Sequence, residues 1–431
     1  MRLNTFPLLA LALTSPCCRV RGEGLVDDDD APFAGTTLVG NTITRTDVSD
    51  LAAITIDIRD MSIFCEDGDP NGARAIYRDG KNAAYSLKEL ATKEQHLEND
   101  LTFAFQMYGL SGGKPEEAAK YRLFASEYVE QKFDEMNCFA AVFAAQHMIL
   151  WMHTSFAIWN TVMSCAIAAD PSFDNEAAGV DNMPAKADEI VAYWVGLIQD
   201  DAEGVEGYSL YSSTNEIAEA FGTDVTGGAR ANRNILYAYE VVSGILSSEE
   251  ACTGKTKTIE QLWPYVTEIS RQTLVPQIQW LIDSMVAEDL ESIDLFARIV
   301  VPQVSQCRYS SYTYLKETFL DIKYEPSKFH KTLKVLQSVY SCLGLTCLDI
   351  GLPYEKDDNG LGCVDDYDPP TIAGYPASTD VTEQSKIDLD MHQINVLVRQ
   401  AGRHLFCVIY LFVHIIHFTI QCQCQHRFIN T

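Results

Sequence analysis

Two of the chain's nine histidines, His147 and His153, lie in a long apolar stretch, residues 136–169, that contains no Asp, Glu, Lys or Arg. A buried imidazole needs a hydrogen-bond partner or a metal ion. Six residues of straight helix place the two rings about 120° apart, so both reach one cavity only if the helix breaks near residues 153–155. Two interpretations stay open: histidines bonded within the core, or at least one ligand that faces a polar pocket.

The other candidate ligands are oxygen donors. Glu127 and Tyr128 lie on a predicted helix over residues 121–133, just ahead of the histidine-bearing stretch. Tyr77 and Tyr211 lie in two segments of similar sequence, GARAIYRDGKN (72–82) and GYSLYSSTNE (207–216). Phenolate and carboxylate oxygens with an occasional imidazole form the ligand set that ferric iron prefers. The alternative for Glu127 is a helix face exposed to solvent.

Other motifs that could do chemistry are incomplete. Asp67 and Asp69 match the beginning of an EF-hand loop, but Arg78 stands at the twelfth position, where a bidentate glutamate is needed. Residues 253–258 contain GKT without the first glycine of a phosphate-binding loop. An HExxH sequence is absent, and no nucleophile is paired with a base. The sequence predicts a polar turn at residues 67–72 and a protein that is not an enzyme.

The elements that would position these residues are predicted to be helices. Residues 136–169 are apolar on every face, which predicts one buried helix, or two end to end. A membrane span is not expected there, because polar residues such as Gln146 interrupt the stretch. Apolar residues also recur at intervals of three and four over 51–64, 278–285, 295–304 and 329–343, and no useful strand alternation occurs. The predicted fold class is all-α.

The domain organisation is predicted from changes in composition. In chain order we expect a signal peptide (1–22), an acidic flexible segment (23–46), a first helical half (47–195), a second helical half (196–352), an acidic linker (353–400) and an apolar tail (401–431). The similar segments around Tyr77 and Tyr211 favour two related halves. The apolar run of the tail is shorter than a bilayer-spanning helix, so it is a short anchor, a cleaved anchor signal or translated non-coding sequence.

Charge and cysteine usage restrict the function classes. A formal net charge of −28 argues against nucleic acid as a partner, because phosphate contacts need clustered Lys and Arg. Eight of the 13 cysteines lie in the body: Cys65, Cys138, Cys165, Cys252, Cys307, Cys342, Cys347 and Cys363. An even number of cysteines after a predicted signal peptide is consistent with up to four disulfides. It also favours a secreted protein or one on the extracellular face of the plasma membrane. The pairing stays open, although a continuous helix would turn Cys342 and Cys347 about 140° apart and send them to different partners.

Several segments in order along the chain resemble the phytotransferrin-like family of secreted algal iron-assimilating proteins. They are IYRDGKN (76–82), YWVGLIQ (193–199), GYSLYSSTNEIAEAF (207–221), VVPQVSQC (300–307) and LQSVYSCLGLTCLDIG (336–351). The resemblance covers roughly residues 50–351. It implies a duplicated helical ectodomain at the cell surface that binds ferric iron with carbonate, and cell-surface or membrane proteins as further partners. The alternative is a metal-free structural or interaction ectodomain with the same disulfide-stapled helical body.

Overall fold

The computed structural model describes residues 35–39, 42–92, 124–169, 182–197, 207–226, 228–248, 251–252, 256–305, 307–321 and 324–351. The predicted signal peptide, acidic linker and apolar tail, together with Cys363, lie outside these residues. Within them, strand pairing is limited to β1 (Asp224–Val225) with β2 (Gly228–Ala229) and one isolated bridge between Thr37 and Ile43. The prediction of an all-α fold is confirmed.

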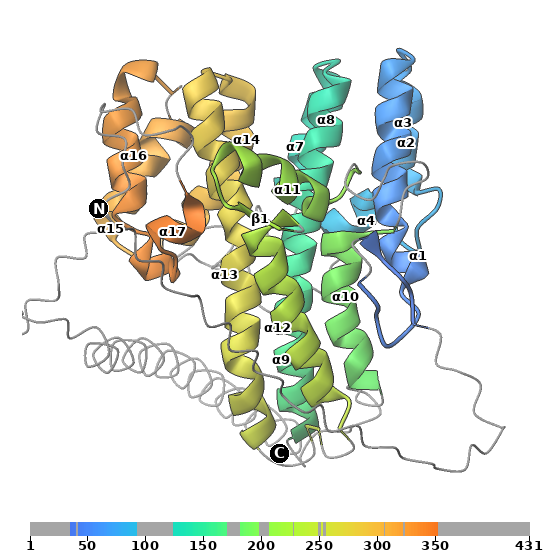
Figure 1. Cartoon of the computed structure of the whole chain (residues 1–431). Coiled ribbons are helices and arrows are strands. Elements are labelled where there is room, and N and C mark those ends of the chain that lie inside the picture. The colour runs from blue at the N-terminus through green and yellow to red at the C-terminus, as the bar shows by residue number, and fades with distance from the viewer. Residues whose placement is uncertain are drawn as a thin grey trace, which may run out of the picture.

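The described helices fall into two groups along the chain (Figure 1). The first comprises α1 (Ser49–Ala52), α2 (Ile54–Glu66), α3 (Pro70–Asp79), α4 (Leu87–Thr92), α7 (Phe124–Asp134), α8 (Cys138–Ala144), a π-helix (Ala145–Ile149), α9 (Leu150–Ala169) and α10 (Met183–Val195). The second comprises α11 (Leu210–Ala220), α12 (Arg230–Leu246), α13 (Thr256–Ala287), α14 (Leu290–Val304), α15 (Tyr309–Lys316), a π-helical turn (Glu317–Asp321), short 3-10 turns (Pro326–Lys328 and Ser341–Leu343), α16 (Phe329–Gln337) and α17 (Cys347–Ile350).

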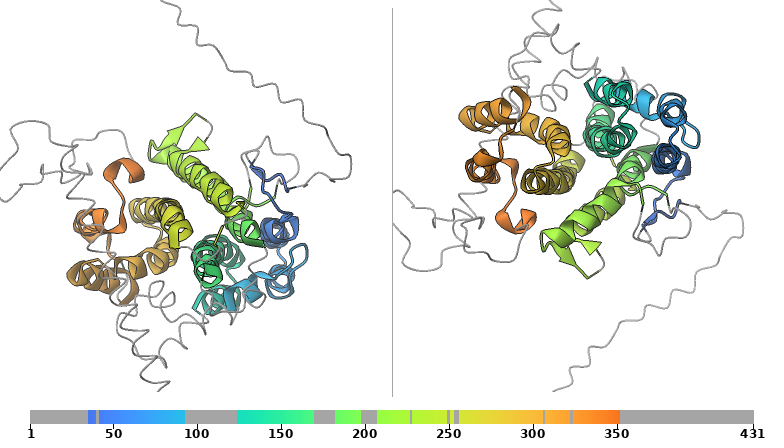
Figure 2. Two further views of the ribbon diagram at one scale, coloured as in Figure 1. Left: turned by 90° about the horizontal axis from the view of Figure 1, so that it is seen from below. Right: turned by 90° about the horizontal axis from the view of Figure 1, so that it is seen from above.

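The centre of the molecule is a bundle of four long helices, α9, α10, α12 and α13, in which α9 packs on α10 and α13, and α12 packs on α10 and α13. Figure 2 shows α1 to α4 on one side of this bundle and α15 to α17 on the other. One hydrophobic core runs through helices of both predicted halves, so the halves do not form separate cores. Whether they are related by duplication stays a prediction.

The apolar stretch over residues 136–169 is helical and buried as predicted, but its interruption is not where we expected it. The break near residues 153–155 that would let both histidines reach one cavity does not occur, since α9 continues through these residues. The irregular turn is the π-helix Ala145–Ile149, which contains His147 and in which every residue is buried. A π-helical turn admits one extra residue while it keeps the backbone hydrogen-bonded, which an open break in a dry core would not. Among the described helices, none has the length and apolarity to cross a membrane.

The turn at residues 67–72 is a polar connection between two helices, as predicted. Helix α2 ends at Glu66, and Gly68 adopts a φ of 74° that favours glycine. The Asp69 carboxylate then accepts the backbone N–H of Gly72 at 2.9 Å and caps α3, which begins with Pro70. Asp69 therefore serves the helix N-terminus in this turn.

Ordered structure begins earlier than residue 47, where we expected it. Leu38 is fully buried, and a segment that precedes α1 is held by the buried carboxylate of Asp188 on α10. Asp188 Oδ2 accepts the backbone N–H groups of Arg45 and Thr46 at 3.0 and 2.7 Å and the Thr46 hydroxyl at 2.7 Å, and Oδ1 accepts the Tyr239 hydroxyl at 2.6 Å. A buried carboxylate needs such donors, and the N-terminal segment supplies three of them.

Three disulfides join the helices covalently. Cys65–Cys138 links α2 to α8, Cys165–Cys252 links α9 to the residues ahead of α13, and Cys307–Cys342 links the start of α15 to the turn after α16. Cys347 is also disulfide-bonded. Because Cys342 pairs with Cys307, the prediction that Cys342 and Cys347 have different partners is confirmed. The prediction of a disulfide-stapled helical body is confirmed with it.

Candidate functional site

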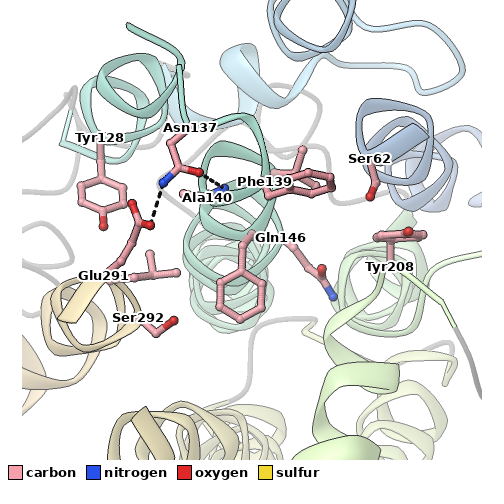
Figure 3. A pocket seen from close by; sticks show the side chains of 12 residues that line it. Ser62, Tyr128, Asn137, Phe139, Ala140, Gln146, Tyr208, Glu291 and Ser292 are labelled. Atoms are coloured by element: carbon pink, nitrogen blue, oxygen red, sulfur yellow. Dashed lines mark hydrogen bonds between the residues drawn. The ribbon is translucent and has the colours of Figure 1, made fainter. Parts of the chain in front are cut away.

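A half-open pocket of about 370 Å³ lies where α7, α8 and α14 meet, with α2 and the segment ahead of α11 at its far side (Figure 3). Its walls are largely apolar and include Phe139, Phe143 and Leu295. Phe139 is 54% exposed, which is high for a phenylalanine. A mainly apolar cavity of this size with a few polar groups is typical of a small-ligand site.

Tyr128 on α7 is the predicted ligand that lines this pocket. Its hydroxyl is buried and has no hydrogen-bond partner within the described part of the chain. The Lys132 ammonium lies 5.1 Å and the Arg298 guanidinium 5.2 Å from the centre of the ring. Burial raises the pKa of Tyr128, and the carboxylate of Asp294 raises it further. The free pocket therefore holds a neutral phenol beside the carboxylate of Asp294.

Glu291 on α14 is the one carboxylate among the residues that line this pocket. Its Oε2 accepts the Asn137 side-chain amide at 2.7 Å, and its Oε1 accepts Lys132 Nζ at 2.9 Å (Figure 3). Asn137 in turn accepts the backbone N–H of Ala140 at 3.2 Å and so caps α8. Lys132 also pairs with Glu135 at 3.2 Å, so one ammonium group serves two carboxylates. The bond to Asn137 ties the position of Glu291 to the start of α8.

His147 lies in the core and does not line this pocket. Its ring packs against Phe143, Phe296 and Trp280, with centroids 4.4, 5.1 and 5.9 Å away. Ser213 Oγ accepts the Trp280 indole N–H at 2.9 Å and lies 3.2 Å from His147 Nε2. Ser213 thus lies between the indole and the imidazole. His147 Nδ1 is buried and has no hydrogen-bond partner among the described residues. Burial lowers the pKa of His147 to about 3. These contacts match the core-histidine interpretation.

The remaining predicted ligands have separate surroundings. His153 on α9 is buried and lies edge-on to Tyr193 at 4.3 Å between ring centroids. Tyr77 is fully buried and donates to Ser126 Oγ at 3.0 Å, and burial raises its pKa to about 12. Tyr211 is buried on α11.

Glu127 is exposed on α7, as expected for a solvated helix face. Of the six predicted ligands, Tyr128 is the one that contributes to the pocket lining. In the described residues, no group of three or more His, Cys, Asp or Glu side chains is arranged to hold a metal ion.

Sequence reasoning missed Glu291, Asn137 and Tyr208 as pocket residues. Asn137 could have been found, because an Asn directly ahead of an apolar helical run is a typical N-cap. Glu291 could not, since it lies 154 residues from the Asn137 amide to which it bonds and no local pattern relates the two.

The buried histidine gives the protein a specific pH dependence. Between the unfolded pKa of 6.5 and the folded pKa of about 3, the unfolded chain binds more protons at His147 than the folded one. As the pH falls through this range, His147 should therefore lower the free energy of unfolding by about 1 kcal/mol for each pH unit. Urea unfolding at pH 6 and pH 4 measures the loss, and His147→Gln should reduce it while exposed His330→Gln should not. Equal pH dependence in wild type and His147→Gln would contradict the buried neutral state.

In comparisons with known proteins, no family model, no curated protein and no solved structure matches this chain. The fold and pocket therefore carry no activity by analogy. Functional inference depends on the chemistry of the residues themselves.

Proposed function

We propose that the chain is a non-enzymatic binding protein that works outside the cell and holds its ligand in the Tyr128 pocket. The observation that carries this proposal is the pocket itself, whose lining includes the phenol of Tyr128 and the carboxylate of Glu291. The disulfides support the extracellular location, because such bonds persist in oxidising compartments.

Ferric iron, with carbonate as the anion that the resemblance implies, is the ligand we propose for this site. A phenol and a carboxylate are oxygen donors of the type that ferric iron prefers, so the residue types fit. Both are engaged in the free protein, since Glu291 bonds to Lys132 and Tyr128 is protonated. Binding would displace Lys132 and release the phenol proton, so affinity should fall as the pH falls.

The second candidate is a metal-free interaction ectodomain of the cell surface. The specific observation in its favour is the set of contacts already made by the predicted ligands. His147 is enclosed by aromatic rings, Tyr77 bonds to Ser126, and Glu291 pairs with Lys132.

Elemental analysis of the protein purified from its native source separates the two candidates. The iron proposal predicts close to one iron atom per chain, lost after incubation at acidic pH. Absence of iron from protein isolated under iron-replete conditions would favour the metal-free ectodomain.

A further inference from the structure

A second cleft, with a volume of about 610 Å³, opens between α15 and α16. All charged side chains that line it are basic: Arg308, Lys331 and Lys334, with His330 beside them. The chain as a whole has 60 acidic and 32 basic residues. A cleft without a carboxylate is therefore unusual for this molecule, and its local potential is opposite in sign to the net charge.

The three cations are exposed and have no carboxylate partner among the described residues. Lys331 Nζ lies 4.6 Å from the centre of the Tyr314 ring, and this contact holds it at the cleft. Neighbouring lysines behave differently, since Lys328 pairs with Glu325 at 3.3 Å. The cleft thus presents a set of uncompensated positive charges.

The walls of the cleft are fixed relative to each other. The Cys307–Cys342 disulfide connects the residue before Arg308 to the turn after α16. The hydroxyls of Tyr314 on α15 and Thr332 on α16 lie 3.3 Å apart and form a hydrogen bond between the two helices. The helices therefore need no rearrangement when the cleft binds an anion, which lowers the conformational-entropy cost of binding.

We propose that this cleft binds a polysaccharide chain through its sulfate esters. Lys and Arg side chains bind sulfate groups by charge-assisted hydrogen bonds. The cleft is far larger than one sulfate ion, which fits a ligand that presents several anionic groups. The net negative charge does not prevent this, because charges more than about 8 Å away are largely screened at physiological ionic strength. The inference rests on the proposed extracellular location and is independent of iron binding.

The rest of the lining favours a sugar over an acidic peptide. Ser310 and Ser311 add hydroxyl groups to the lining, which can donate to and accept from the hydroxyls of a sugar. Ser338 already donates to the Val335 carbonyl and can accept. Val335 is the one aliphatic side chain in the lining. An acidic peptide would lack the ring hydroxyls that such serines can bond to, so the serines favour a sugar.

Fluorescence polarisation with a labelled heparin octasaccharide tests the proposal on the full chain. Wild type should bind in low salt and lose affinity as salt is added. The double variant Lys331→Glu/Lys334→Glu should bind at least tenfold more weakly. The matched control is Lys186→Glu/Lys257→Glu, which makes the same change in charge near the starts of α10 and α13 and lies outside the cleft lining. It should bind within twofold of wild type, and Arg308→Glu alone should also weaken binding.

Competitors identify the chemistry that is recognised. The same octasaccharide without its sulfate groups, inorganic sulfate and a polyglutamate peptide should all compete at least tenfold less well than the sulfated octasaccharide. Equal competition by the desulfated sugar or by polyglutamate would overturn the proposal, as would equal losses in the two double variants or no binding by wild type. Iron binding has a different site and readout, so the two tests can fail separately.

Discussion

Replacing Cys165 and Cys252 together with alanine is expected to lower the free energy of unfolding by about 4 to 5 kcal/mol. The disulfide between them spans 87 residues and connects α9 to the residues that precede α13. Without this disulfide the unfolded chain gains the conformational freedom of a long open loop. In the folded protein both cysteines are fully buried in the core. Urea unfolding, followed by the helical signal in far-ultraviolet circular dichroism, measures the change.

The matched control is the double replacement of Cys307 and Cys342, whose disulfide spans 35 residues. Loop-closure entropy predicts a loss about 1 kcal/mol smaller for this shorter span. If the Cys165 and Cys252 variant unfolds at the wild-type urea concentration, the disulfide does not form in the native protein, and the inferred oxidising compartment is contradicted.

Asp188→Ala is expected to destabilise the protein by about 3 to 5 kcal/mol. The buried carboxylate accepts four hydrogen bonds, from the Arg45 and Thr46 backbones, the Thr46 hydroxyl and the Tyr239 hydroxyl. Its removal leaves several buried donors without an acceptor, and each unpaired group costs about 1 to 3 kcal/mol. Urea unfolding measures the total loss, and exposed Asp224→Ala, a control on β1, should change stability by less than about 0.5 kcal/mol.

Limited proteolysis then distinguishes a local effect from a global one. Asp188 lies on α10 and anchors the segment that precedes α1. In the variant, a protease that leaves the helical body intact should therefore cut within residues 35–46. Unchanged resistance of that segment, together with a small loss of stability, would mean that Asp188 does not hold it.

The helices could largely be predicted because their information is local. The uncharged stretch over residues 136–169 predicts a buried helix without any knowledge of its neighbours. Helix α13 is longer than the pattern over residues 278–285 predicts. It begins at Thr256 and includes Pro264 and Pro276, which are unfavourable inside a helix. Pro264 is exposed, so water can satisfy the carbonyl group that its ring leaves unbonded.

The site could be predicted only in part because its contacts are long-range. Tyr128 was selected for its residue type and its place ahead of the buried helix, and it lines the pocket. Its neighbour Glu291 reaches the pocket from the start of α14, and Asp188 bonds to Thr46 across 142 residues. Such pairs depend on how helices pack, and one sequence contains no signal for them. The π-helical turn around His147 likewise depends on tertiary packing, because its residues alone look like ordinary helix.

The most direct test of the proposed function is an absorption titration of the purified protein with ferric iron in the presence of bicarbonate. The account predicts a phenolate-to-iron absorption band that saturates near one iron per chain, weakens when bicarbonate is removed, and is lost in Tyr128→Phe. The control Tyr237→Phe, at an exposed tyrosine on α12, should keep the band. A band that persists unchanged in Tyr128→Phe would contradict the assignment of the pocket. No band in wild type would contradict iron binding and leave the metal-free ectodomain.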